Sequence, residues 1–226
     1  DRDLDAIQTL VIKMAGLVEE AIMSAAKSLE MRDTDLADRV RAGDKVIDAL
    51  ELQINEEAAR VIALRAPVSK DLRAILTVLR IAASLERIGD YAKNMAKRTG
   101  TLVDMPVIAG SDAALRRMAR EVQAMLKDIL DAYLRGDVAL AEDVRQRDHE
   151  IDQMYNALFR EFLTFMMEDP RNITTCMHLH FMAKNVERMG DLVTNMAEQV
   201  IYLVTGEMPE EARPKGDKTA YVTDAT

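Results

Sequence analysis

Two short stretches of the chain are nearly identical and carry the same oxygen-bearing side chains. ERIGDYAKNMA begins at Glu86, ERMGDLVTNMA begins 101 residues later at Glu187, and seven of their eleven positions match. Each stretch places a Glu, an Asp and an Asn at successive intervals of four residues. Because residues four apart share one face of a helix, these oxygens would line a single helix face. Hard oxygen ligands of this kind suit Mg, Mn, Ca or Fe ions.

Further acidic pairs with the same spacing lie upstream, in DKVID at Asp44 and DHEID at Asp148. The midpoint between the two acidic pairs is Pro67 in the first half, and it falls between Asp169 and Pro170 in the second. If antiparallel helices turn at these prolines, with a rise of about 1.5 Å per residue, both pairs of each half lie at the same height. The candidate ligands are therefore Asp44, Asp48, Glu86, Asp90 and Asn94 in the first half, and Asp148, Asp152, Glu187, Asp191 and Asn195 in the second.

Carboxylates gathered in this way must be compensated. Like charges on a semi-buried surface raise the pKa of some members, so the acids need protons, cations or a basic partner. Gly89 and Gly190, each inside a duplicated stretch, leave room for a metal or for another backbone at close range. Two other interpretations remain open: the acids could form ordinary solvated helix faces, or they could meet Arg or Lys on a partner helix, with metal incidental.

The elements that must position these acids are all helical. Long runs of Ala, Leu, Met, Glu, Arg and Lys are separated by most of the five prolines and nine glycines. Apolar residues recur at intervals of three and four. The pattern predicts helices over about 4–31, 36–64, 69–99, 112–134, 138–167 and 171–204, with Ser69 as a helix N-cap.

The halves of the chain repeat one plan. Met14 and Leu36 recur 104 residues later as Met118 and Leu140, whereas the ER-x-GD stretches are 101 residues apart, which predicts a second hairpin loop shorter by three residues. The expected fold is all-α, with two tandem three-helix bundles related by internal duplication. The expected divisions are 1–105 and 106–206 for the bundles and 207–226 for a flexible tail.

Composition narrows the setting. The 226 residues carry a formal net charge of -9, which disfavours contact with nucleic acid or with anionic lipid. Cys176 is the single cysteine and reads as a small core residue, and no run of apolar residues approaches a membrane span. We expect a folded cytoplasmic protein.

The paired acidic motifs resemble those of the PhoU family, in which ER-x-GD-x-x-x-NMA closes each of two tandem bundles. The resemblance covers about 4–204. It implies a cytoplasmic homodimer that restrains high-affinity phosphate uptake and represses the phosphate-starvation response. The implied partners are the ATPase subunit of the phosphate ABC transporter and a phosphate-sensing histidine kinase, and the protein would meet a membrane only through them. The resemblance also implies divalent or ferric metal ions, from among Fe, Zn, Mn, Mg and Ca, at the ten candidate ligands. In one departure, Arg171-Asn172 replaces Lys70-Asp71 at the start of the last helix.

Enzymatic functions have less support in the sequence. It contains no Gly-rich phosphate loop, nucleophile elbow or HExxH helix, and no Glu-x-x-His, which a di-iron carboxylate enzyme would need. His180, seven residues before Glu187, reads as a partly buried histidine rather than a ligand. The main alternative to a metal-binding regulator is a structural helical adaptor without functional metal.

Overall fold

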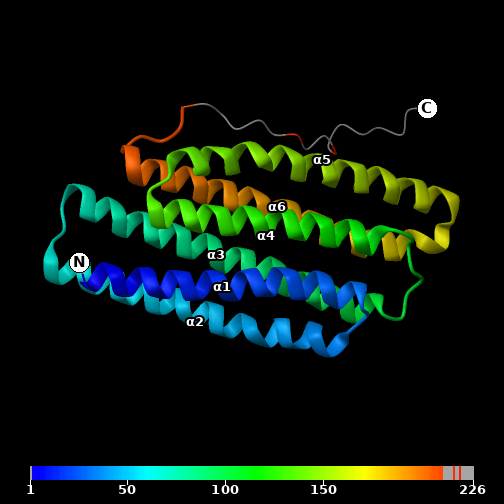
Figure 1. The fold of residues 1–226 in the computed structure, drawn as a ribbon. Coiled ribbons are helices and arrows are strands. Elements are labelled where there is room, and N and C mark those ends of the chain that lie inside the picture. Colours follow the sequence, from blue (N-terminus) through cyan, green and yellow to red (C-terminus); the bar gives the residue numbers. More distant parts are fainter. Residues whose placement is uncertain (1, 211–215, 217–218, 220–226) are drawn as a thin grey trace.

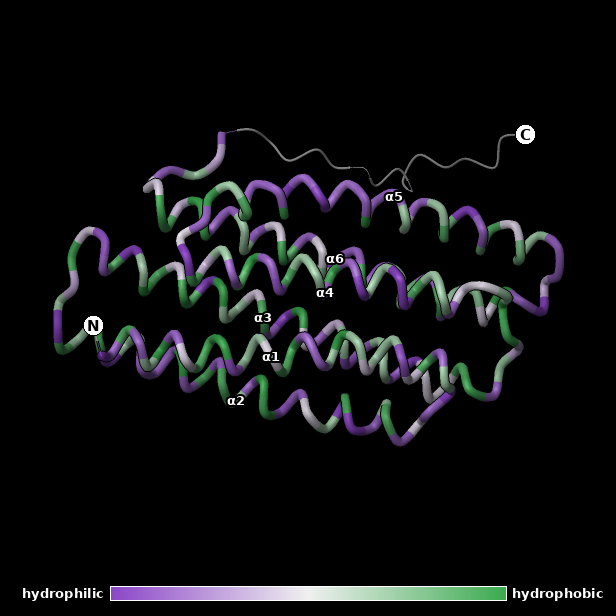
Figure 2. The backbone as a smooth tube through the Cα atoms, viewed as in Figure 1, coloured by the Kyte–Doolittle hydropathy of each residue, from purple (hydrophilic) through white to green (hydrophobic). Residues whose placement is uncertain are grey.

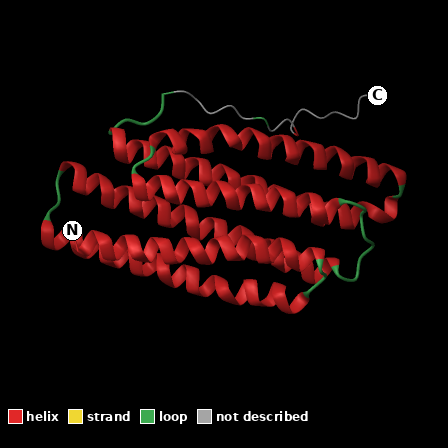
Figure 3. Ribbon diagram, in the orientation of Figure 1, coloured by secondary structure: helices red, strands yellow, loops and turns green. Residues whose placement is uncertain are grey.

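Six long helices account for nearly all of the chain (Figure 1 and Figure 3). The computed structural model describes residues 2–210, 216 and 219, and within this part it contains no strand. The helices are α1 (Arg2–Glu30), α2 (Thr34–Arg65), α3 (Ser69–Leu102), α4 (Ser111–Arg135), α5 (Val138–Glu168) and α6 (Ile173–Thr205), with a short 3-10 turn η1 (Pro170–Asn172) before α6. The all-α prediction is confirmed.

Equivalent capping residues begin the second helix of each half. The Asp33 side chain accepts a hydrogen bond from the Leu36 amide at 2.9 Å, and Asp137 does the same for Leu140 at 3.0 Å. Each cap satisfies an amide that has no partner inside its own helix. Gly136 ends α4 in a left-handed conformation with φ of 65°, which a residue without a Cβ adopts at little cost.

The hairpin ends differ from the sequence expectation in two places. Ser69 is not the N-cap of α3: Val68 takes that position without a side-chain hydrogen bond, and Ser69 is already the first helical residue, with φ of 51°. The last long helix begins at Ile173 rather than 171, because η1 forms the first turn after Pro170. Its lead-in residue Asp169 accepts a hydrogen bond from the Arg171 amide at 3.0 Å, which favours the tighter turn.

The two halves pack side by side along their length (Figure 1). In each half three helices contact one another, and the halves meet through α1 against α4 and α3 against α6. The remaining helices, α2 and α5, lie on the outside, and each packs mainly against the other helices of its own half. The second and third helices of each half turn back at residues 66–68 and at Asp169, where the prolines predict a turn.

One continuous hydrophobic core joins the halves, so the duplicated units share their interior rather than forming separate cores. Figure 2 shows apolar positions alternating with polar ones along each helix. Met14 and its repeat Met118 are both buried, as is Cys176. Even Ile108, in the connection between the halves, is buried. No helix formed by the described residues is both long enough and apolar enough to cross a membrane.

The predicted tail, 207–226, falls mostly outside the described residues. Its described members are 207–210, 216 and 219.

Candidate functional site

The first acidic cluster lies where α2 faces α3, and it contains a lysine. Asp44 of α2 is only 3% exposed, although it is ionisable. The Lys93 ammonium donates hydrogen bonds to Asp44 Oδ2 and, at 2.8 Å, to Asp90 Oδ1. These bonds raise the pKa of Lys93, with the bond to Asp44 contributing most. Asp44 Oδ1 accepts no hydrogen bond from the described residues, so one buried lone-pair site of this carboxylate stays open.

Glycines of the duplicated stretches permit this close approach of helices. A Cβ on Gly89 would lie 3.2 Å from Ile47 Cδ1 and 3.5 Å from Asp44 Oδ1. In the second half a Cβ on Gly190 would lie 3.1 Å from Asp148 Oδ1. Each glycine therefore lets the first aspartate of the facing acidic pair, Asp44 or Asp148, lie against its own backbone. This close fit explains a residue that is otherwise unfavourable within a helix.

Burial, with repulsion between neighbouring charges, raises the pKa of three acids of the first cluster. Burial raises the pKa of Glu86 to about 7, aided by the charge of Asp90 and a hydrogen bond between the two carboxyls. Burial and the charge of Asp44 likewise raise the pKa of Asp48. Glu51, which the sequence reasoning missed, belongs to the same group because burial and the charges of Asp48 and Asp90 raise its pKa. Its signal was its place three residues after Asp48, on the same helix face.

The second acidic cluster, between α5 and α6, is more deeply buried. Asp148, Asp152 and Glu187 are 1%, 2% and 4% exposed. Burial raises the pKa of Glu187, and the charges of Asp191 and Asp152 add to the effect. Lys184 opposes it, with its ammonium 3.0 Å from Glu187 Oε2.

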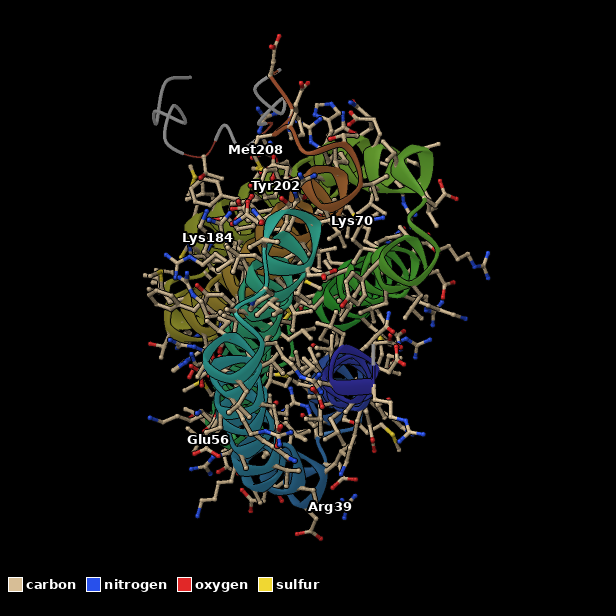
Figure 4. The ribbon with its side chains drawn as sticks, turned by 90° about the vertical axis from the view of Figure 1, so that its left-hand side faces the viewer. Arg39, Glu56, Lys70, Lys184, Tyr202 and Met208 are labelled. Atoms are coloured by element: carbon tan, nitrogen blue, oxygen red, sulfur yellow. The ribbon has the colours of Figure 1, made fainter. Side chains whose placement is uncertain are left out.

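Each cluster thus contains a lysine, but the two lysines occupy non-equivalent positions of the repeat. Lys93 follows Asp90 by three residues, whereas Lys184 precedes Glu187 by three, and their repeat equivalents are Thr194 and Ala83. The Lys184 ammonium also lies 4.9 Å from the centre of the Tyr155 ring. Figure 4, a view along the helices, labels Lys184 toward one side of the molecule. Lys93 meets Asp90 on its own helix and Asp44 on the neighbouring helix α2, whereas Lys184 meets Glu187 on its own helix.

Predicted carboxylates of each half therefore influence one another across two helices, Asp48 with Glu86 in the first half and Asp152 with Glu187 in the second. Asn94 and Asn195 are both exposed, which weakens their candidacy as neutral ligands. His180 is half-buried between aromatic rings, 5.8 Å from Tyr155 and 5.4 Å from Phe159 between ring centres, and it fits the structural role expected of it.

The oxygen atoms of the clusters are of the type that a hard cation prefers, but they are not placed around a common point. Carboxylates at raised pKa and the open Asp44 Oδ1 are suitable ligands. Among the described residues, however, no three His, Cys, Asp or Glu side chains stand together as a ready set of metal ligands. A metal ion would have to take the place of a lysine ammonium and draw the carboxylates inward. Metal binding at the ten candidate residues stays a prediction.

The raised pKa of Glu86 predicts a pH-dependent stability. Between its ordinary value of 4.5 and about 7, the folded protein keeps a proton that the unfolded chain releases. The free energy of unfolding should therefore fall as pH rises through this window, by about 1–2 kcal/mol after allowance for solvent screening. Glu86→Gln should lack this fall. Urea denaturation from pH 4.5 to 8 measures it, with the exposed Glu56→Gln (Figure 4) as a control for losing one charge. Parallel curves for Glu86→Gln and the unmodified protein would contradict the assignment.

The fold and the site together place this protein in a class of all-helical proteins. Members of this class consist of two duplicated three-helix bundles, each with an acidic cluster between its second and third helices. The PhoU domain family model matches residues 11–99 and again 115–200, and the chain belongs to the PhoU family.

Relatives match over nearly their full length. The PhoU homologue of the phosphate-specific transport system from Rhizobium meliloti is 42% identical over 100% of this chain and 95% of its own, and the Caulobacter vibrioides homologue is 45% identical over 92% and 90%. Both are named accessory proteins of that system. The crystal structure of PhoU from Pseudomonas aeruginosa superposes with a TM-score of 0.88 at 37% identity, covering 91% of this chain and 99% of that one. PhoU from Streptococcus pneumoniae, described as a regulatory protein of phosphate transport, gives 0.86 at 27% identity, covering 93% and 99%.

Proposed function

We propose that this protein is a non-enzymatic regulator of high-affinity phosphate uptake, acting as an adaptor on the phosphate ABC transporter. The observation that carries the proposal is the family match over both halves, because relatives matching over nearly their whole length are named accessory proteins of phosphate transport. The inferred partners are the transporter ATPase subunit and a phosphate-sensing histidine kinase, and the protein acts in the cytoplasm as a homodimer. It represses the phosphate-starvation response when phosphate is ample.

Exposed apolar side chains at the hairpin tips support an adaptor role. Leu64 and Val68, at the turn between α2 and α3, are each 73% exposed. Met167 and Ile173 take the corresponding place in the second half, at 84% and 46%. Figure 1 places the two tips at opposite ends of the molecule. Apolar side chains that recur at equivalent exposed places suit contact with other proteins.

The acidic clusters suit regulation by cations. The residues that would hold a metal are Asp44, Asp48, Glu86 and Asp90 in the first half and Asp148, Asp152, Glu187 and Asp191 in the second. A divalent or ferric ion bound there would supply the positive charge that these carboxylates require. Lys93 and Lys184 supply part of that charge already, which favours a second candidate function, an adaptor that works without metal.

A cell-based experiment tests the proposal. In a bacterium that relies on this protein, deleting its gene should turn on a phosphate-starvation reporter in rich phosphate, and the unmodified gene should restore repression. The pair Leu64→Asp with Val68→Asp should restore repression poorly and should bind the purified ATPase subunit or the kinase more weakly. Leu52→Asp, at a residue 59% exposed on the same helix, is the matched control. Full repression in the deletion strain would refute the regulatory function.

A further inference from the structure

A residue of the C-terminal segment lies buried on the surface of α5. The Gly216 amide donates a hydrogen bond to Asp152 Oδ2 at 2.6 Å, and the Gly216 carbonyl accepts one from Asn156 Nδ2 at 2.5 Å. Asp152 and Asn156 are one helical turn apart, so together they engage both polar groups of this backbone unit. Such a pair recognises a peptide backbone rather than a side chain.

The contact has room only for glycine. A Cβ on Gly216 would lie 2.9 Å from His149 Nδ1 and 3.0 Å from Asp152 Cβ. The Asp152 Cβ is held by the backbone of α5 and cannot withdraw, so a side chain at this position would push Gly216 away from the helix. The fit is therefore specific to this position in the segment.

The two halves differ at this place, where the Gly216 amide donates a hydrogen bond to Asp152. Asp48, the repeat equivalent of Asp152, is exposed, whereas Asp152 is 2% exposed. The surrounding sequence also suits an acidic surface, because 213–218 (RPKGDK) contains three basic residues and one acidic residue. Opposite charge favours holding this segment over carboxylates.

We propose that His149, Asp152 and Asn156 form a peptide-binding site whose occupant is the chain's own segment around Gly216. Bound there, Gly216 engages Asp152, one of the carboxylates that a cation would need. Segment and cation therefore compete, and the clusters of the two halves respond differently to metal. The competition rests on the proposed metal-dependent function, whereas the docking does not.

Limited digestion of the full-length protein by trypsin tests the docking. The measured quantity is the rate of cleavage between Lys218 and Thr219 in metal-free buffer. Asn156→Ala removes one of the two hydrogen bonds and should speed cleavage about fivefold, because the segment opens more often. Asn55→Ala, the same change at an exposed position of α2, is the matched control and should leave the rate unchanged. Unchanged melting temperatures for both variants exclude a general loss of folding.

A second variant and a metal titration complete the test. Gly216→Ala, which leaves α5 intact, should also speed cleavage at the same bond. Equal rates for the unmodified protein, Asn156→Ala and Gly216→Ala would overturn the docking. Addition of Mn²⁺ should speed cleavage of the unmodified protein but not of Gly216→Ala. If Mn²⁺ has no effect while both variants are cleaved faster, the docking stands and the competition is overturned.

Discussion

Neutralising the acids of the two ER-x-GD stretches is expected to abolish divalent metal binding while the protein stays folded. The variant combines Glu86→Gln, Asp90→Asn, Glu187→Gln and Asp191→Asn. Amide oxygens carry no net charge, so each substitution removes most of the attraction for a cation. Affinity for Mn²⁺, measured by equilibrium dialysis, should fall at least about 100-fold. The melting temperature should hold or rise, because burial and neighbouring charges raise the pKa values of Glu86 and Glu187, and amides relieve that repulsion.

A lysine variant is expected to act in the opposite direction. Lys93→Met removes the ammonium that bridges Asp44 and Asp90, so the first cluster should bind Mn²⁺ more tightly. Lys97→Met, at an exposed position one turn further along α3, is the matched control. Affinities unchanged in both the amide variant and Lys93→Met would show that metal binds elsewhere or not at all.

The amide variant also separates the two candidate functions in cells. If cation binding matters to signalling, the phosphate-starvation reporter should stay partly on in rich phosphate. Normal repression by a variant that no longer binds metal would favour the adaptor without metal. The two halves can be tested separately by the Glu86→Gln with Asp90→Asn pair and by its equivalent in the second half.

The helices and their pairing could be predicted from sequence because they depend on local patterns. Apolar periodicity gives the buried face of each helix, and the prolines near Pro67 and Pro170 give the turns. Placing the acidic pairs at equal distances from those turns predicts Asp48 near Glu86 or Asp90 and Asp152 near Glu187 or Asp191. In the structure the charge of Asp90 adds to the effect of burial on the pKa of Asp48, and the charge of Asp152 does the same for Glu187. Helix ends were less predictable, since the 3-10 turn after Asp169 depends on a side-chain hydrogen bond.

The lysines of the clusters could not be chosen from sequence. Lysine is common on helices, and its long side chain reaches neighbours one turn away in either direction. Lys93 and Lys184 occupy different repeat positions, so the duplication that singled out the acids gave no signal for them. The contact of Gly216 was equally hard to predict, because its backbone atoms bond Asn156, which lies 60 residues earlier in the sequence.

The duplicated glycines supply the sharpest test of how the clusters are built. Gly190→Val is expected to lower the free energy of unfolding by about 3 kcal/mol, because overpacking a closely fitted interface costs this much. Even its Cβ would lie 3.1 Å from Asp148 Oδ1 and 3.4 Å from Ile151 Cγ2, and Asp148 is buried with little room to withdraw. Gly43→Val, within α2 where nothing lies within 4 Å of the added Cβ, is the matched control.

Urea denaturation of the two glycine variants measures the difference. Gly43→Val should match or slightly exceed the unmodified protein, because glycine is the weaker helix former by a few tenths of a kcal/mol. Equal stability of Gly43→Val and Gly190→Val would mean that α5 moves away from α6 without cost. In that case the close seating of Asp148 against the α6 backbone is not what holds the second cluster together.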